Sequence, residues 1–119
     1  MTFTTPADFE LFKKECRKWI DRLSLDEWKF TFYQEKINSN ADCTSSIIDK
    51  NIVIRLAKTI EIENRTKREC IKSLAQHEVL HSLLEGLYHQ ARDRAFCHDD
   101  YLMAEHCVIH RLQKAFKEK

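Results

Sequence analysis

An apolar helical pattern between Thr66 and Leu87 constrains the fold of this chain more than any other part of its sequence. Apolar residues recur there three and four positions apart and leave little of the helix circumference polar. They are Cys70, Ile71, Leu74, Ala75, Val79, Leu80, Leu83, Leu84 and Leu87. Because such a helix must be covered by neighbours on several sides, the pattern predicts a buried central helix. The only glycine of the chain, Gly86, lies where this helix is expected to end.

The residues before this helix predict a first helix and a small sheet. Apolar residues at helical spacing from Pro6 to Leu23 follow a capping box, in which Thr5 and Asp8 would satisfy the first backbone amides. From Trp28 the period changes to two, which indicates strands over about residues 28–33, 41–48 and 51–57. Short connections between consecutive strands favour a three-stranded antiparallel sheet.

The C-terminal part of the chain predicts a loop and a last helix. Tyr88 to Asp100 shows no clean period and is expected to be a loop, whereas Tyr101 to about Phe116 shows helical spacing. A chain of 119 residues is long enough for one continuous core and too short for two. The sequence therefore predicts a single α+β domain over residues 1–119: an N-terminal helix, a small antiparallel sheet, the central helix and a C-terminal helix.

Charge, hydropathy and cysteine content narrow the class of protein. The chain has 20 Lys and Arg against 19 Asp and Glu, so it lacks the global positive charge that gives a strong nucleic-acid signal. No apolar run is long enough to span a membrane, and the first residues do not resemble a signal peptide. The five cysteines form no CxxC pair, which fits reduced and mostly buried thiols. We expect a soluble, cytoplasmic protein with no membrane partner.

The central helix carries the sequence His77-Glu78-Val79-Leu80-His81, which has the form HExxH. Histidines four residues apart project from the same face of a helix, so both imidazoles can reach one ion. Catalytic zinc (Zn2+) takes three protein ligands and keeps a fourth position open. Glu78 would then act as the general base that takes a proton from the attacking water.

The HExxH sequence is also compatible with a site that holds no zinc. The same letters fit a core in which His77, Glu78 and His81 are buried and satisfied by neighbours. Two histidines and a carboxylate would also suit ferrous iron, although a glutamate inside the motif favours hydrolysis over oxygen chemistry. The extended motif HExxHxxGxxH is excluded, because Leu84 and Leu87 occupy its glycine and third histidine positions.

A third ligand is expected downstream of the motif, and helical phase favours Glu105. The candidates are His89, His98, Asp99, Asp100, Glu105, His106 and His110. On a helical projection of the last segment, Glu105 falls in the middle of an apolar stripe formed by Leu102, Ile109, Leu112 and Phe116. A lone carboxylate there indicates a functional site, unless it pairs with Arg94 or Arg111. His106 and His110 fall to the side and are expected to be surface residues.

Together these features resemble the compact SprT-like and phage-type metallopeptidases, which have a minimal zincin fold. The resemblance extends from Leu25 to Phe116 and rests on Trp28 at the first strand, HExxH, and a Glu-His step at Glu105. It implies zinc on His77, His81 and Glu105, with Glu78 as general base. It also implies that residues 51–57 line the substrate cleft and pair with an extended peptide. No residue is a secure counterpart of the oxyanion-stabilising histidine or tyrosine, for which Tyr88, His89, His98 and Tyr101 are candidates.

We therefore expect a zinc metallopeptidase that hydrolyses peptide bonds of a protein or peptide substrate through a metal-activated water, with Glu78 as general base. The alternative is a non-catalytic zinc-binding interaction module of phage or DNA-associated origin. A metal-free helical adaptor is a third possibility. The sequence does not fix the oligomeric state.

Overall fold

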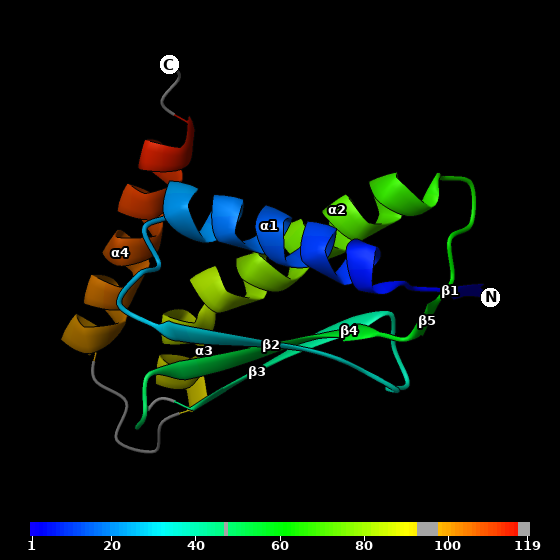
Figure 1. The fold of residues 1–119 in the computed structure, drawn as a ribbon. Coiled ribbons are helices and arrows are strands. Elements are labelled where there is room, and N and C mark those ends of the chain that lie inside the picture. The colour runs from blue at the N-terminus through cyan, green and yellow to red at the C-terminus, as the bar shows by residue number, and fades with distance from the viewer. Residues whose placement is uncertain (47, 93–97, 117–119) are drawn as a thin grey trace.

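The computed structural model describes residues 1–46, 48–92 and 98–116, and these form an α+β fold as expected. Figure 1 shows α1 and α2 side by side over one face of a sheet made by β2, β3 and β4, with α4 at one end. In chain order the elements are β1 (Thr2–Phe3), α1 (Pro6–Arg22), β2 (Lys29–Glu35), β3 (Ala41–Ser46), β4 (Asn51–Ala57), β5 (Thr59–Ile60), α2 (Lys67–Leu83), α3 (Glu85–Arg92) and α4 (His98–Phe116).

Capping boxes define where α1 and α2 begin. The predicted box at Thr5 is confirmed: the Thr5 hydroxyl accepts from the Asp8 amide at 3.1 Å, and the Asp8 carboxylate accepts from the Thr5 amide at 2.8 Å. Thr66 and Glu69 repeat this arrangement at the start of α2. Asp8 also forms a salt bridge of 2.8 Å with Lys67, so the same carboxylate caps α1 and contacts the first residue of α2.

The predicted antiparallel meander is wrong, because the sheet is mixed and its order is β2-β4-β3. β2 runs parallel to β4, and β3 runs antiparallel to it. β4 takes the centre because its inward side chains Ile52, Ile54 and Leu56 are fully buried, whereas β2 and β3 are half-buried. Residues 36–40 cross two strand spacings, roughly 10 Å, which a segment of that length easily spans.

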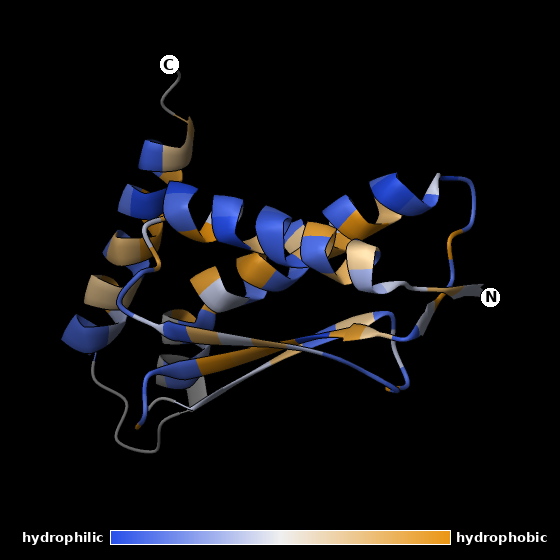
Figure 2. Cartoon of the chain, in the orientation of Figure 1, coloured by the Kyte–Doolittle hydropathy of each residue, from blue (hydrophilic) through white to orange (hydrophobic). Residues whose placement is uncertain are grey.

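The core lies between the helices and the sheet, where Figure 2 shows the apolar residues gathered. Phe12 and Cys16 of α1 and Ile71 and Val79 of α2 are fully buried there. The expected burial of α2 on several sides is not observed. Its buried side chains form one stripe, and Leu80 on the opposite side is 38% exposed. This is because α1 and the sheet cover one side of α2.

The segment after α2 differs from the expectation of a long helix and then a loop. α2 ends at Leu83, Leu84 is its C-cap, and α3 follows at once, so Gly86 lies inside α3. Part of the predicted loop is therefore helical, and α4 begins at His98 instead of Tyr101. Arg94 and Cys97 lie outside the described residues. Across the described part of the chain, no helix is both long and apolar enough to cross a membrane.

Asp8 should link stability to pH. Burial acts to raise the pKa of Asp8, but hydrogen bonds from Lys67 and Thr5 outweigh burial and hold this pKa below its usual value. A lowered folded-state pKa stabilises the fold above the unfolded-state pKa of about 3.9, and the effect is lost as pH falls through the folded-state pKa.

We expect Asp8→Asn to lower the free energy of unfolding near pH 7 by about 1 kcal/mol. The difference from the wild type should shrink as the pH falls toward the acid range, because protonated Asp8 resembles asparagine. Urea unfolding at neutral and acid pH measures both effects, with the exposed Asp21→Asn as the matched control. Equal stability of Asp8→Asn and the wild type at neutral pH would contradict the prediction.

Candidate metal centre

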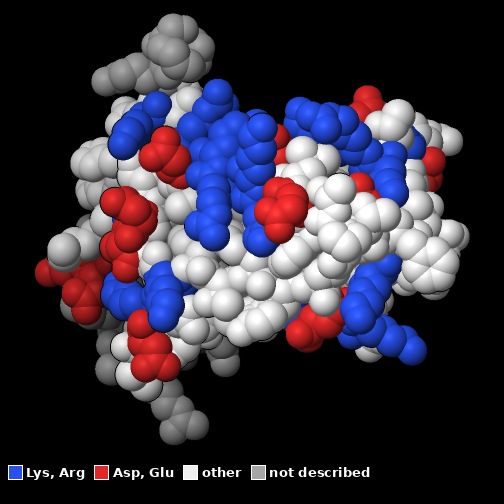
Figure 3. Space-filling model, in the orientation of Figure 1, with Lys and Arg blue, Asp and Glu red and all other residues white. Residues whose placement is uncertain are grey.

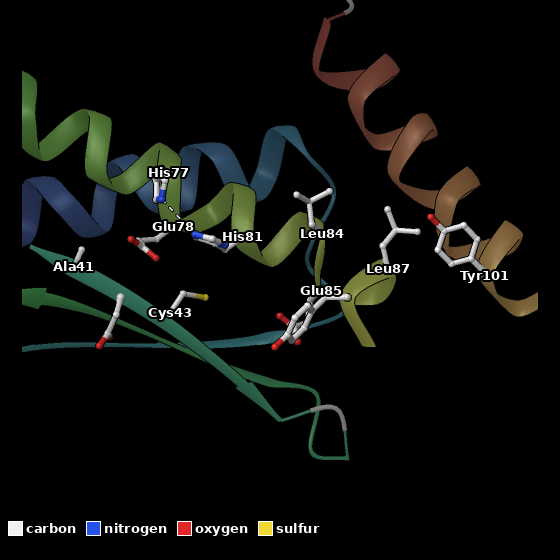
Figure 4. A pocket seen from close by; sticks show the side chains of 11 residues that line it. Ala41, Cys43, His77, Glu78, His81, Leu84, Glu85, Leu87 and Tyr101 are labelled. Carbon is white, nitrogen blue, oxygen red and sulfur yellow. Dashed lines mark hydrogen bonds between the residues drawn. The ribbon is translucent and has the colours of Figure 1, made fainter. Parts of the chain in front are cut away.

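The two motif histidines converge on the exposed side of α2, near its C-terminal end. The Nε2 atoms of His77 and His81 lie 3.2 Å apart, at hydrogen-bonding distance, and their rings meet edge to face (Figure 4). Two nitrogens bound tetrahedrally to one zinc ion at 2.0–2.1 Å are themselves about 3.3 Å apart. The pair therefore has the separation of two ligands of one ion. Both side chains are exposed, which does not fit the alternative in which the two histidines are buried in a core.

Glu78 differs from its neighbours because it belongs to the buried stripe of α2 and is only 5% exposed. Figure 4 shows its carboxylate directed toward β3, below His77. Burial raises the pKa of Glu78, His77 and His81 partly offset this, and the Asp42 charge adds to it. No hydrogen bond or ion pair to its carboxylate occurs among the described residues. A carboxylate with a raised pKa is a better proton acceptor than an ordinary one.

His77, Glu78 and His81 open into a cavity of about 810 Å³ between β3 and the helices. β3 forms one wall, α2 and α3 form the opposite wall, and Tyr101 reaches in from α4 (Figure 4). The other lining residues are Ala41, Asp42, Cys43, Leu84, Glu85, Leu87 and Tyr88. Tyr88 and Tyr101 were expected as candidate oxyanion-stabilising residues, and both line this cavity.

The third expected ligand, Glu105, does not lie beside the two histidines. Within residues 1–46, 48–92 and 98–116, no three His, Cys, Asp or Glu side chains lie close enough to hold one ion. Glu105 is half-buried in α4, one helical turn beyond Tyr101, and does not line the cavity. The structure thus brings together His77, Glu78 and His81, and the role of Glu105 as a ligand stays a prediction.

The buried face of α4 is not centred on the residue at which the sequence places the middle of its apolar stripe, Glu105. Val108 is its buried residue, whereas Ile109 is 42% exposed and Phe116 is 76% exposed. Glu105 lies one turn before Val108 and remains on the inner side of the helix. Arg111, a possible partner of Glu105, instead contacts Glu27 and donates to the Ser24 carbonyl at 3.0 Å.

The other candidate ligands lie at the surface. His106 and His110 stack with their ring centroids 6.4 Å apart and are exposed, as the sequence predicts. His89, His98, Asp99 and Asp100 are also exposed.

Three cavity residues, Asp42, Cys43 and Glu85, are not found by the sequence argument. Asp42 and Cys43 come from β3, and only the tertiary fold places them opposite α2. Cys43 lies 3.6 Å from the Ser82 hydroxyl, and burial raises the pKa of its thiol to about 11, which keeps it neutral. Glu85 had a usable signal, because it continues the four-residue spacing of His77 and His81.

Comparison with protein-family models, with curated proteins and with solved structures finds no match to this chain. The function is therefore argued from the site itself.

The metal content of purified variants tests the ligand assignment. We expect the wild-type chain to bind one zinc ion. His77→Ala removes a direct ligand, so it should lower the zinc affinity by more than the roughly 10–100-fold that loss of a residue behind a ligand causes. Glu105→Ala should lose zinc affinity as His77→Ala does. The substitution of the exposed His106 by Ala should leave the zinc content and affinity of the wild type unchanged. Elemental analysis and zinc titration measure both quantities. If Glu105→Ala kept its full zinc content and Glu85→Ala lost zinc, the third ligand would be Glu85 and the assignment of Glu105 would be wrong.

Proposed function

We propose that this protein is a zinc-dependent metallopeptidase that hydrolyses peptide bonds in protein or peptide substrates, with Glu78 as general base. The observation that carries the proposal is a pair of imidazoles with the spacing of metal ligands, next to one buried carboxylate, at the wall of a cavity. His77 and His81 would hold the ion, and Glu105 would complete the set as the sequence predicts. When bound, zinc would supply a Lewis acid that polarises a carbonyl and acidifies water.

The position of Glu78 suits proton transfer. Glu78 belongs to the buried stripe of α2, and its carboxylate is directed toward β3. A carboxylate held this way takes a proton from a water that attacks the substrate carbonyl, and it later gives that proton to the leaving amine. Burial raises its pKa, which makes it a better proton acceptor than an exposed carboxylate.

The strand that would bind substrate is β3, which corrects the expectation for residues 51–57. β4 is hydrogen-bonded to β2 on one side and β3 on the other, so its backbone groups are already paired. In the described part of the chain β3 pairs with β4 alone, and its Ala41, Asp42 and Cys43 line the cavity. An extended peptide would therefore add to the free edge of β3 and pass beside Glu78.

The alternative function is a zinc-binding interaction module without turnover. The same edge of β3 would then bind a protein segment without cleaving it.

Glu78→Gln separates the two functions. We expect this variant to bind zinc like the wild type and to lose roughly 100- to 10,000-fold in peptide cleavage, because the proton acceptor is gone. Cleavage of an unfolded protein mixture, read by mass spectrometry, measures the loss, with exposed Glu61→Gln as the matched control. If both the wild type and the variant bound zinc and neither cleaved the mixture, the peptidase proposal would be wrong and the interaction module would be supported.

A further inference from the structure

The candidate site continues into a groove that follows β3. A second cavity of about 470 Å³ adjoins the first, and the two share Cys43, Glu85 and Tyr88 as lining residues. The second cavity is lined further by Thr44, Ser45, Ser46, Ile48 and His89. The six residues from Ala41 to Ser46 thus line the groove in succession. An extended chain of six residues is roughly 20 Å long, so the groove runs along about that length of β3.

Glu85 is an unpaired charge in the part of this groove that both cavities share. It is half-buried, and it has no hydrogen bond or ion pair with any described residue. Asp42, by contrast, is paired with Arg55, whose Nε donates to it at 2.8 Å. Figure 4 shows Glu85 beside the later part of β3, whereas Glu78 lies beside its start.

The surroundings of Glu85 suit a long basic side chain. Lys and Arg side chains gather over α1 (Figure 3), but in the described structure none lines either cavity. The nearby lining residues Leu84, Leu87 and Tyr88 offer apolar surface on which the methylene stem of Lys or Arg can pack. A charged head group beyond this surface meets the Glu85 carboxylate.

The positions of Glu78 and Glu85 along β3 give the place of that side chain in a bound peptide. Glu78 lies beside the start of β3 at Ala41, and Glu85 lines both cavities, which meet at Cys43, two residues further along the strand. A peptide paired with β3 advances by the same distance per residue as the strand, so Glu85 faces a residue about two positions from the one beside Glu78.

We infer that the groove selects extended peptides with a lysine or arginine about two residues from the bond beside Glu78, and that Glu85 is the residue that determines this preference. The inference rests on the proposed function in one respect, namely that the peptide bond beside Glu78 is the bond that is cleaved. Binding of such a peptide along β3 does not require turnover.

Peptide binding to Glu78→Gln in the presence of a chelator tests the inference without cleavage or metal. The probes are short, capped, fluorescent peptides that are identical except for Lys, Gln or Glu at one position, scanned along the sequence. We expect the Lys peptide to bind about two- to fivefold more tightly than the Gln peptide at one position, and the Glu peptide to bind more weakly than either. High salt should reduce this difference.

The added substitution Glu85→Gln should abolish the difference between the Lys and Gln peptides, and Glu85→Lys should reverse the preference toward Glu. Glu61→Gln is the matched control and should keep the wild-type preference. Circular dichroism verifies that each variant is folded. Equal binding of the Lys and Gln peptides, a preference that survives Glu85→Gln, or no binding of any peptide would each overturn the inference. Selective binding without cleavage by the zinc-loaded wild type would overturn the proposed function and leave the preference for basic side chains standing.

Discussion

The packing of one stripe of α2 against α1 and the sheet is the constraint on which the rest of the structure depends. That stripe contains Cys70, Ile71, Ala75 and Val79, and Glu78 lies within it. Because the helical repeat fixes the angle between successive side chains, burial of the stripe places His77 and His81 on the other side, at the cavity. Burial of this apolar stripe thus determines how the Glu78 carboxylate and the two imidazoles are presented to the cavity that all three line.

The mixed sheet determines which backbone edge the cavity can use. β4 is the most apolar strand and takes the centre, so β2 and β3 become the edges of the sheet. β3 lies on the side of α2 that carries the motif. An antiparallel meander in chain order would have placed β3 in the centre and left its backbone groups fully paired. The topology of this small sheet is therefore as important for the proposed site as the motif.

The sequence predicts the elements of this protein better than their arrangement. Capping boxes and apolar periods are local signals, and they place α1, β2, β4 and the start of α2 closely. The order of the strands depends on which one buries most area, and short connections do not reveal this. The helical phase of α4 identifies Glu105 as an inner-side residue but not how far it lies from His81, because phase gives an angle and no distance. Asp42 and Cys43 leave no local signal, since their place in the site results from a contact between β3 and α2.

The early end of α2 at Leu83 has a further electrostatic consequence. The peptide dipoles of a helix add up to a partial negative charge at its C-terminus, and their effect is strongest within the last turn. His81 lies in that turn, and Glu85 begins the next helix. Because α2 ends at Leu83, this negative end lies beside His81 instead of one turn further along the chain. The partial positive charge at the start of α3 lies next to this negative end, and the carboxylate of Glu85 in the first turn of α3 offsets it, so the electrostatic potential beside His81 depends on the charge of Glu85.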